Sequence, residues 1–247
     1  MTNTLHRYGD AESFADDYIV FATPSRDRND VDSVPKLKKF LEMALPFKPV
    51  NIGDPVHGGT LRPSRNLNTV ANWKRDMTPD FRAVIDGIDT PVSVVAIFDN
   101  QAAAREFLKV AADADLGLSI NMSASVEGAK ACCKFAGITR HSVGYSLGFE
   151  GATDKLPNTQ LLKLTTMCGH GMVSASLAKK MIDWVKEGRR TPGQAVTYMA
   201  RFCSCGVFNP ARAQRVLEDA PRRWNEKNSQ PAYPALLQLP AKAVLSP

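Results

Sequence analysis

Three cysteines and one histidine are the residues of this sequence best suited to chemistry. Cys168 and His170 stand in the run Cys-Gly-His-Gly, while Cys203 and Cys205 form a Cys-x-Cys pair followed by Gly206. Glycine permits tight turns and lets the backbone approach a bound group closely. Because side chains two residues apart on a helix point about 200° apart, both sulfurs of the pair can reach one centre only where the helix has ended. We therefore expect one shared site, built from two glycine-flanked turns.

An iron–sulfur cluster is the leading interpretation of this site. The three thiolates of Cys168, Cys203 and Cys205 can occupy three corners of a [4Fe-4S] cube, which leaves the fourth iron open to a substrate. The familiar cluster spacings, such as C-x₂-C-x₂-C, are absent, so the prediction rests on residue types and on their placement in turns. It implies an iron–sulfur lyase that carries out elimination, hydration or sulfur removal on a small anionic substrate.

Two other uses of the same residues remain open. With His170 as a fourth ligand, the Cys-x-His and Cys-x-Cys pairs provide the N/S donors of a tetrahedral zinc site. Alternatively, the chain is a thiol-redox or sensor protein without a cluster. In that case the position of Cys168 just before a helix predicts a lowered thiol pKa, and Cys203 and Cys205 would resolve its oxidised product.

Further polar residues are candidates for substrate chemistry at this site. His170 and Asp99 are the predicted catalytic residues, since either can move a proton. Arg212 and Ser123 are the predicted substrate-binding residues, because an arginine in the first turn of a helix suits a carboxylate or phosphate, and Ser123 follows a predicted strand. Cys132 and Cys133 lie in the middle of a predicted helix, which favours simple burial over ligation.

The first part of the chain, residues 1–150, alternates apolar β-branched runs with helical patterns. Such alternation with short links predicts an α/β body, in which a parallel or mixed sheet is covered by helices. Residues 92–148 in particular predict a β-α-β-α-β layer. The expected strands are 18–23, 50–52, 92–98, 116–121 and 141–147.

The remaining part, residues 151–247, predicts a mainly helical cap that carries the cysteine site. Ser174 or Ser176, Thr191-Pro192 and Asn209-Pro210 are start signals for three helices, and residues 161–165 read as one more strand. The Pro- and Ala-rich tail after Trp224 is expected to be an extended strap or a frayed end.

Composition limits the function classes. The chain has 247 residues and a formal net charge of +6. Residues 1–150 hold 17 Lys/Arg and 19 Asp/Glu, whereas residues 151–247 hold 14 and 6. No recognisable nucleic-acid motif accompanies the basic half, so a small anionic substrate is the expected partner rather than nucleic acid. Without a membrane-length apolar run or a leader pattern we expect a cytoplasmic protein, and a homo-oligomer is compatible with the sequence.

Overall fold

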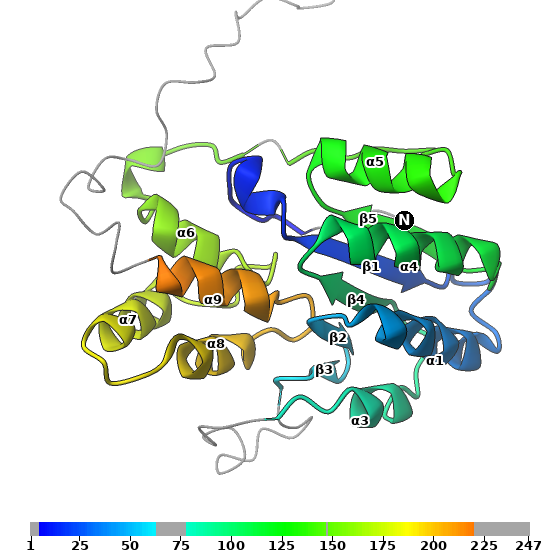
Figure 1. The fold of residues 1–247 in the computed structure, drawn as a ribbon, viewed down its shortest axis with the longest axis horizontal. Coiled ribbons are helices and arrows are strands. Elements are labelled where there is room, and N and C mark those ends of the chain that lie inside the picture. Colours follow the sequence, from blue (N-terminus) through cyan, green and yellow to red (C-terminus); the bar gives the residue numbers. More distant parts are fainter. Residues whose placement is uncertain (1–4, 63–77, 147, 220–247) are drawn as a thin grey trace, which may run out of the picture.

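Five short strands form one sheet at the centre of the protein (Figure 1). The computed structural model describes residues 5–62, 78–146 and 148–219. The order of strands across the sheet is β3-β2-β4-β1-β5, and each pair of neighbours is antiparallel. The strands are β1 (Tyr18–Thr23), β2 (Asn51–Asp54), β3 (Gly58–Gly59), β4 (Val94–Phe98) and β5 (Ser119–Ser123).

The prediction of a parallel or mixed sheet was wrong, although the chain is a mixture of helices and strands as expected. β4 and β5 run in the same direction, but β1 lies between them and is antiparallel to both. All six residues of β1 are buried. A strand that is apolar on both faces buries the most apolar surface in the middle of a sheet. This explains why β1 lies between β4 and β5, the two strands that α4 connects.

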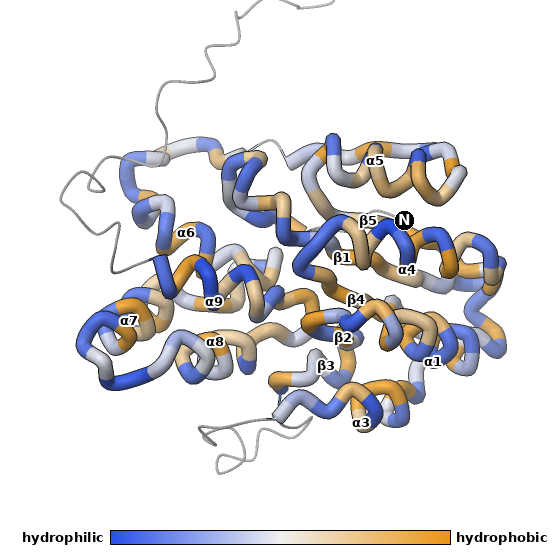
Figure 2. Tube along the Cα trace, viewed as in Figure 1, coloured by the Kyte–Doolittle hydropathy of each residue, from blue (hydrophilic) through white to orange (hydrophobic). Residues whose placement is uncertain are grey.

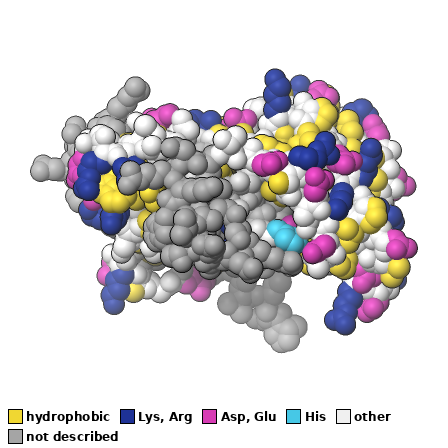
Figure 3. Space-filling view, turned by 90° about the horizontal axis from the view of Figure 1, so that it is seen from below, with side chains coloured by type: hydrophobic (Ala, Val, Ile, Leu, Met, Phe, Trp, Pro, Cys, Tyr) yellow, Lys and Arg dark blue, Asp and Glu magenta, His cyan; other side chains and the backbone are white. Residues whose placement is uncertain are grey.

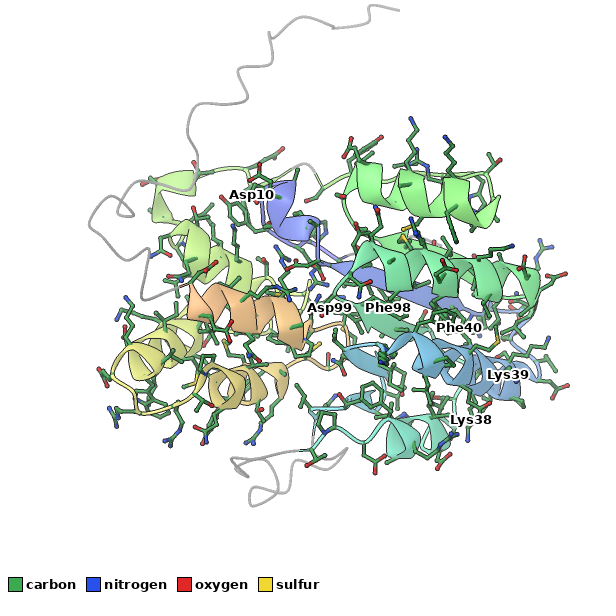
Figure 4. All side chains as sticks on the ribbon, in the orientation of Figure 1. Asp10, Lys38, Lys39, Phe40, Phe98 and Asp99 are labelled. Carbon is green, nitrogen blue, oxygen red and sulfur yellow. The ribbon has the colours of Figure 1, made fainter. Side chains whose placement is uncertain are left out.

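Four helices cover one face of the sheet. They are α1 (Ser33–Ala44), α3 (Phe81–Asp86), α4 (Gln101–Asp113) and α5 (Val126–Ala136). The side chains of Asn100 and Ser125 cap α4 and α5, and Gly137 ends α5 in the left-handed conformation. Inside this layer Phe107 packs against Phe40 and Phe98, with ring centroids 4.9 and 5.3 Å apart; Phe40 and Phe98 are labelled in Figure 4.

The C-terminal helices cover the other face. They are α6 (Thr159–Thr165), α7 (Ala175–Lys186), α8 (Pro192–Ala200) and α9 (Pro210–Glu218). Alternate residues of β1 serve the two layers: Tyr18 and Val20 join the core of α1, α3, α4 and α5, whereas Ile19 and Phe21 join the core of α6–α9. Apolar and polar residues alternate along these helices, as expected for elements buried on one side (Figure 2). The predicted helical part therefore packs directly on the sheet.

Two predicted strands do not form. Residues 161–165 belong to α6, because Asn158 caps a helix there by accepting the N–H of Leu161. Residues 141–146 have no regular structure and are mostly exposed, so the predicted third strand of the 92–148 layer is absent from them; residue 147 lies outside the described residues. The expected helices at 174, 192 and 210 are confirmed, with Ser174, Thr191 and Asn209 as caps.

Short 3₁₀ turns complete the architecture at η1 (Glu12–Phe14), η2 (Leu45–Phe47) and η3 (Thr153–Lys155). Residues 63–77 lie outside the described part of the chain, and so does the tail after Trp224. No helix among the described residues has the length and apolar character needed to cross a membrane.

The burial of Cys132 yields a first testable prediction. Cys132 is fully buried in α5, and burial raises the pKa of its thiol to about 11. Because only the thiolate reacts, Cys132 should resist iodoacetamide at pH 8 in the folded protein and react after denaturation. Mass spectrometry of the labelled protein measures this directly. Labelling of native Cys132 as fast as a free thiol would contradict its assignment as a packing residue.

Candidate thiol site

The Cys203–Gly206 turn lies against the β2–β3 hairpin through three glycines. α8 ends at Ala200, and Gly206 adopts a φ of +72°. A Cβ atom on Gly206 would lie 2.7 Å from the Cα of Gly53 and 3.2 Å from the Cα of Gly59. Only glycines allow backbones to approach this closely, so their placement fixes the position of the Cys-x-Cys pair.

Asn51 fastens the same turn with its side-chain amide. Its Nδ2 donates to the carbonyls of Gly206 and Phe208 at 3.0 and 2.9 Å, while its Oδ1 accepts from the backbone and hydroxyl of Thr60. Arg62 adds a hydrogen bond from Nη1 to the carbonyl of Ser204 at 3.2 Å. Because Asn51 is buried and fully hydrogen-bonded, it holds the turn rigidly on the sheet.

The second turn follows α6 and contains Cys168 and His170. Cys168 is fully buried, and its sulfur accepts the backbone N–H of Met172 at 3.2 Å. The backbone N–H of His6 donates to the carbonyl of Gly169 at 2.9 Å, so the N-terminal residues run alongside this turn. His170, between two glycines with positive φ, is exposed. The turn therefore buries the thiol of Cys168 and leaves the imidazole of His170 exposed to solvent.

The two turns meet at Cys205. The sulfurs of Cys203 and Cys205 are 3.9 Å apart, and the Cys205 sulfur is 3.3 Å from Nδ1 of His170. Cys168 interacts electrostatically with Cys205. Cys203 is only 2% exposed, whereas Cys205 is partly exposed. The structure thus brings Cys203, Cys205 and His170 into contact and makes Cys205 the more accessible thiol of the pair.

The two thiols of the pair have opposite pKa shifts. The hydrogen bond from Cys203 holds the pKa of the Cys205 thiol below its ordinary value, helped by the backbone N–H of Val207. The same contact, together with burial, raises the pKa of the Cys203 thiol well above its ordinary value. When the pair loses its first proton, the thiolate therefore forms on Cys205 rather than on Cys203.

Arg7 brings a buried positive charge to the thiols. Its guanidinium interacts electrostatically with Cys203 and Cys168. It also donates from Nη1 to the carbonyl of Val207 at 3.3 Å and forms an ion pair with Asp17 at 3.2 Å. Nothing in the sequence pattern around Arg7 signals this role, because the two cysteines and Val207 are distant from it along the chain.

Arg212 shares the carboxylate of Asp17 with Arg7 and is held inside the protein. The guanidinium is 2% exposed and donates from Nη1 to Asp17 at 2.8 Å, and from Nη2 to the carbonyl of Tyr8 at 3.0 Å. Its Cζ lies 4.5 Å from the centre of the Phe14 ring. Arg212 is predicted from the sequence to bind substrate, but its guanidinium is engaged in these internal contacts. Its place in the first turn of α9 is as expected.

Asp99 directly follows β4, and Ser123 is the last residue of β5, so both lie at the C-terminal ends of these strands. Asp99 is labelled in Figure 4. Asp99 accepts a hydrogen bond from the side chain of Asn100 at 3.0 Å, and Ser123 pairs with Ile19. Within the described residues neither side chain shares a hydrogen bond or ion pair with the thiols. The site therefore brings together Cys168, His170, Cys203 and Cys205.

Within the described part of the chain, no group of three or more His, Cys, Asp or Glu side chains has an arrangement that could hold a metal ion. Comparisons of the chain with protein families, with curated proteins and with solved structures find no match.

Proposed function

We propose that this protein carries out thiol–disulfide exchange, with Cys205 as the attacking thiol and Cys203 as the resolving thiol. One observation carries the proposal: two sulfurs 3.9 Å apart, of which the more accessible has a lowered thiol pKa and the buried one a raised pKa. Attack needs an accessible thiolate, and resolution needs a second thiol within reach of the first. A reducing compartment such as the cytoplasm would keep the pair as a dithiol.

The exchange proceeds in two steps. The Cys205 thiolate attacks one sulfur of a substrate disulfide; a mixed disulfide forms and the first substrate thiolate leaves. Cys203 then loses its proton and attacks the Cys205 sulfur, which releases the second substrate thiolate and leaves a Cys203–Cys205 disulfide. The substrate gains two electrons and the protein dithiol loses two. The proton from Cys203 is taken up by a leaving thiolate.

His170 and Arg7 assist from opposite sides of the pair. His170, 3.3 Å from the Cys205 sulfur, can exchange a proton with the attacking thiol or with a leaving thiolate. Arg7 places a buried cation near Cys203, which lowers the energy of the Cys203 thiolate that must form during resolution. Attack from the exposed side and resolution from the buried side follow from this arrangement.

Trapping the intermediate tests the proposal. Trypsin cleaves after Arg201 and Arg212, so one peptide holds both cysteines. Treatment with a small aromatic disulfide should oxidise this peptide by loss of about two hydrogens. In Cys203→Ser, about one equivalent of mixed disulfide per chain should accumulate on Cys205.

Two variants serve as controls for the trapping. Cys205→Ser should release no substrate thiolate above the uncatalysed background, whereas Cys133→Ser should behave as the unaltered protein. Mixed disulfide forming on Cys168 instead of Cys205 would overturn the assignment of the attacking thiol.

A metal centre on Cys168, Cys203, Cys205 and His170 is the second candidate, favoured by the contacts of Cys205 with Cys203 and His170. Metal binding would require these side chains to rearrange, because no group of three among the described residues is arranged to hold a metal ion. Two sulfur ligands of one tetrahedral zinc lie about 3.8 Å apart, close to the 3.9 Å between Cys203 and Cys205. In a [4Fe-4S] cube each thiolate binds its own iron, so the same two sulfurs would have to separate.

Metal analysis after anaerobic purification discriminates between these proposals. One zinc per chain would support the zinc site and about four irons the cluster, with its open iron available to a small anionic substrate. Protein that contains neither metal and forms the mixed disulfide on Cys205 supports thiol exchange. In the zinc case His170→Ala should release the metal, because three ligands hold it much more weakly than four.

A further inference from the structure

Arg201, the residue directly after α8, carries a buried charge with no acceptor. The residue is 8% exposed, and none of its three guanidinium nitrogens has a hydrogen-bond partner within the described residues. Arg7 and Arg212 are also buried, but both form ion pairs with Asp17. Among the described residues, no carboxylate forms an ion pair with Arg201.

An unpaired guanidinium in this state is costly. The group carries five N–H donors and stays charged at any accessible pH. Burying a charge without a partner destabilises a protein, so buried charges are normally paired. An anion that supplies oxygen acceptors would remove this cost, and Arg201 is therefore a candidate ligand-binding residue.

Two aromatic rings connect Arg201 with further cations on α7 and in the turn after it. Its Cζ lies 5.1 Å from the ring centre of Tyr198, which in turn packs edge-on against Trp184 with centroids 6.5 Å apart. Lys180 and Arg190 lie 4.8 and 5.1 Å from the Trp184 ring centre. A cation held on a ring face keeps its N–H donors available for an anion.

The acids on these helices leave this positive charge uncompensated. Glu187 pairs with Arg189 at 3.2 Å, and Asp183 pairs with Lys179 at 2.6 Å. Within the described residues Lys180 and Arg190 form no ion pair. In Figure 3, dark blue Lys and Arg side chains surround a yellow apolar patch at the left end, where α7 lies in Figure 1.

We propose that Arg201 is the main ligand of a phosphate site on the α7–α8 face, with Arg190 and Lys180 as its outer cations. The fork of N–H donors on a guanidinium matches phosphate oxygens, and several cations together favour a group with about two negative charges. Because the central donor is buried, the ligand is the phosphate group of a small molecule. The proposal is independent of the thiol chemistry.

Titration with inorganic phosphate at constant ionic strength, followed by thermal unfolding and calorimetry, tests the site. The unaltered protein should bind about one phosphate per chain, and its Tm should rise by about 5 °C at a hundred times the Kd. Arg201→Gln should lose the binding. Arg201→Met should lose it too, and should raise the Tm of the phosphate-free protein, because the unpaired charge is gone.

Lys179→Gln is the matched control, since it removes one positive charge from the same face but from a carboxylate-paired residue. This variant should bind phosphate with less than about a twofold change in Kd. A purely structural arginine would instead make Arg201→Met less stable and leave phosphate binding intact. That result, or the absence of saturable phosphate binding to the unaltered protein, overturns the proposal whatever the outcome of the thiol experiments.

Discussion

Replacing Asp17 with Ala is expected to lower the free energy of unfolding by about 3–5 kcal/mol, the usual effect of removing one partner from a buried ionic network. Asp17 is 1% exposed and joins the two halves of the chain. Its carboxylate accepts from Arg212 at 2.8 Å and from Asn209 at 2.9 Å, and it pairs with Arg7 at 3.2 Å. In Asp17→Ala, the buried guanidiniums of Arg7 and Arg212 would lose their carboxylate partner.

Urea unfolding followed by circular dichroism measures this effect, and Asp16→Ala is the matched control. Asp16 precedes Asp17 and pairs with Arg215, but both of these side chains are partly exposed. A partly exposed pair contributes about 1 kcal/mol or less, so Asp16→Ala should be mild. Equal losses in the two variants would show that the network around Asp17 is not the main link between the sheet and α9.

The sequence predicted local structure well because the signals for it are local. Ser174, Thr191 and Asn209 are each expected to start a helix, and each caps the helix that follows. The stretch 161–165 was read as a strand because its short apolar run fits either element. Asn158, which caps α6, is the sequence signal that favours a helix over a strand here.

Sheet order and the role of Arg212 could not be predicted, because both depend on contacts between distant segments. The apolar sequence of β1 favours a central place in the sheet, but it does not reveal that β4 and β5 are the strands on either side of it. Arg212 stands where an anion-binding arginine could stand, but Asp17 neutralises it. Arg201, close to the Cys-x-Cys pair in sequence, has no such partner among the residues that the structure describes.

The candidate site was predictable in its members but not in their roles. Glycines beside Cys168 and Cys205 indicated turns, and these turns do meet. Cys168 was the expected reactive thiol, because it lies just before a helix; the structure buries it completely. Which sulfur is accessible depends on how the second turn packs against Gly53 and Gly59, and no local pattern encodes this.

That packing makes Gly206→Ala a disruptive methyl addition next to the thiols. Gly206 has a φ of +72°, and an added Cβ would lie 2.7 Å from the Cα of Gly53, a backbone atom that cannot turn aside. The left-handed conformation costs alanine about 1 kcal/mol and overpacking a further 1–3 kcal/mol. We therefore expect a loss of about 2–4 kcal/mol in the free energy of unfolding.

The same substitution should also slow the chemistry of Cys205. Moving the turn off the β2–β3 hairpin weakens the hydrogen bonds from Cys203 and from the backbone of Val207, both of which lower the pKa of the Cys205 thiol. Each unit by which this pKa rises reduces the thiolate fraction about tenfold at a pH below it, and alkylation at pH 7 should slow accordingly.

Gly188→Ala separates backbone strain from close packing in this experiment. Gly188 has a similar φ of +67°, but an added Cβ would meet nothing within 4 Å. It should therefore cost only about 1 kcal/mol and leave the alkylation rate of Cys205 unchanged. If the two alanine variants lose equal stability and alkylate equally fast, the contact of Gly206 with the hairpin does not position the thiols. A larger loss in Gly206→Ala, together with slower alkylation, identifies that contact as the feature that holds Cys205 beside Cys203.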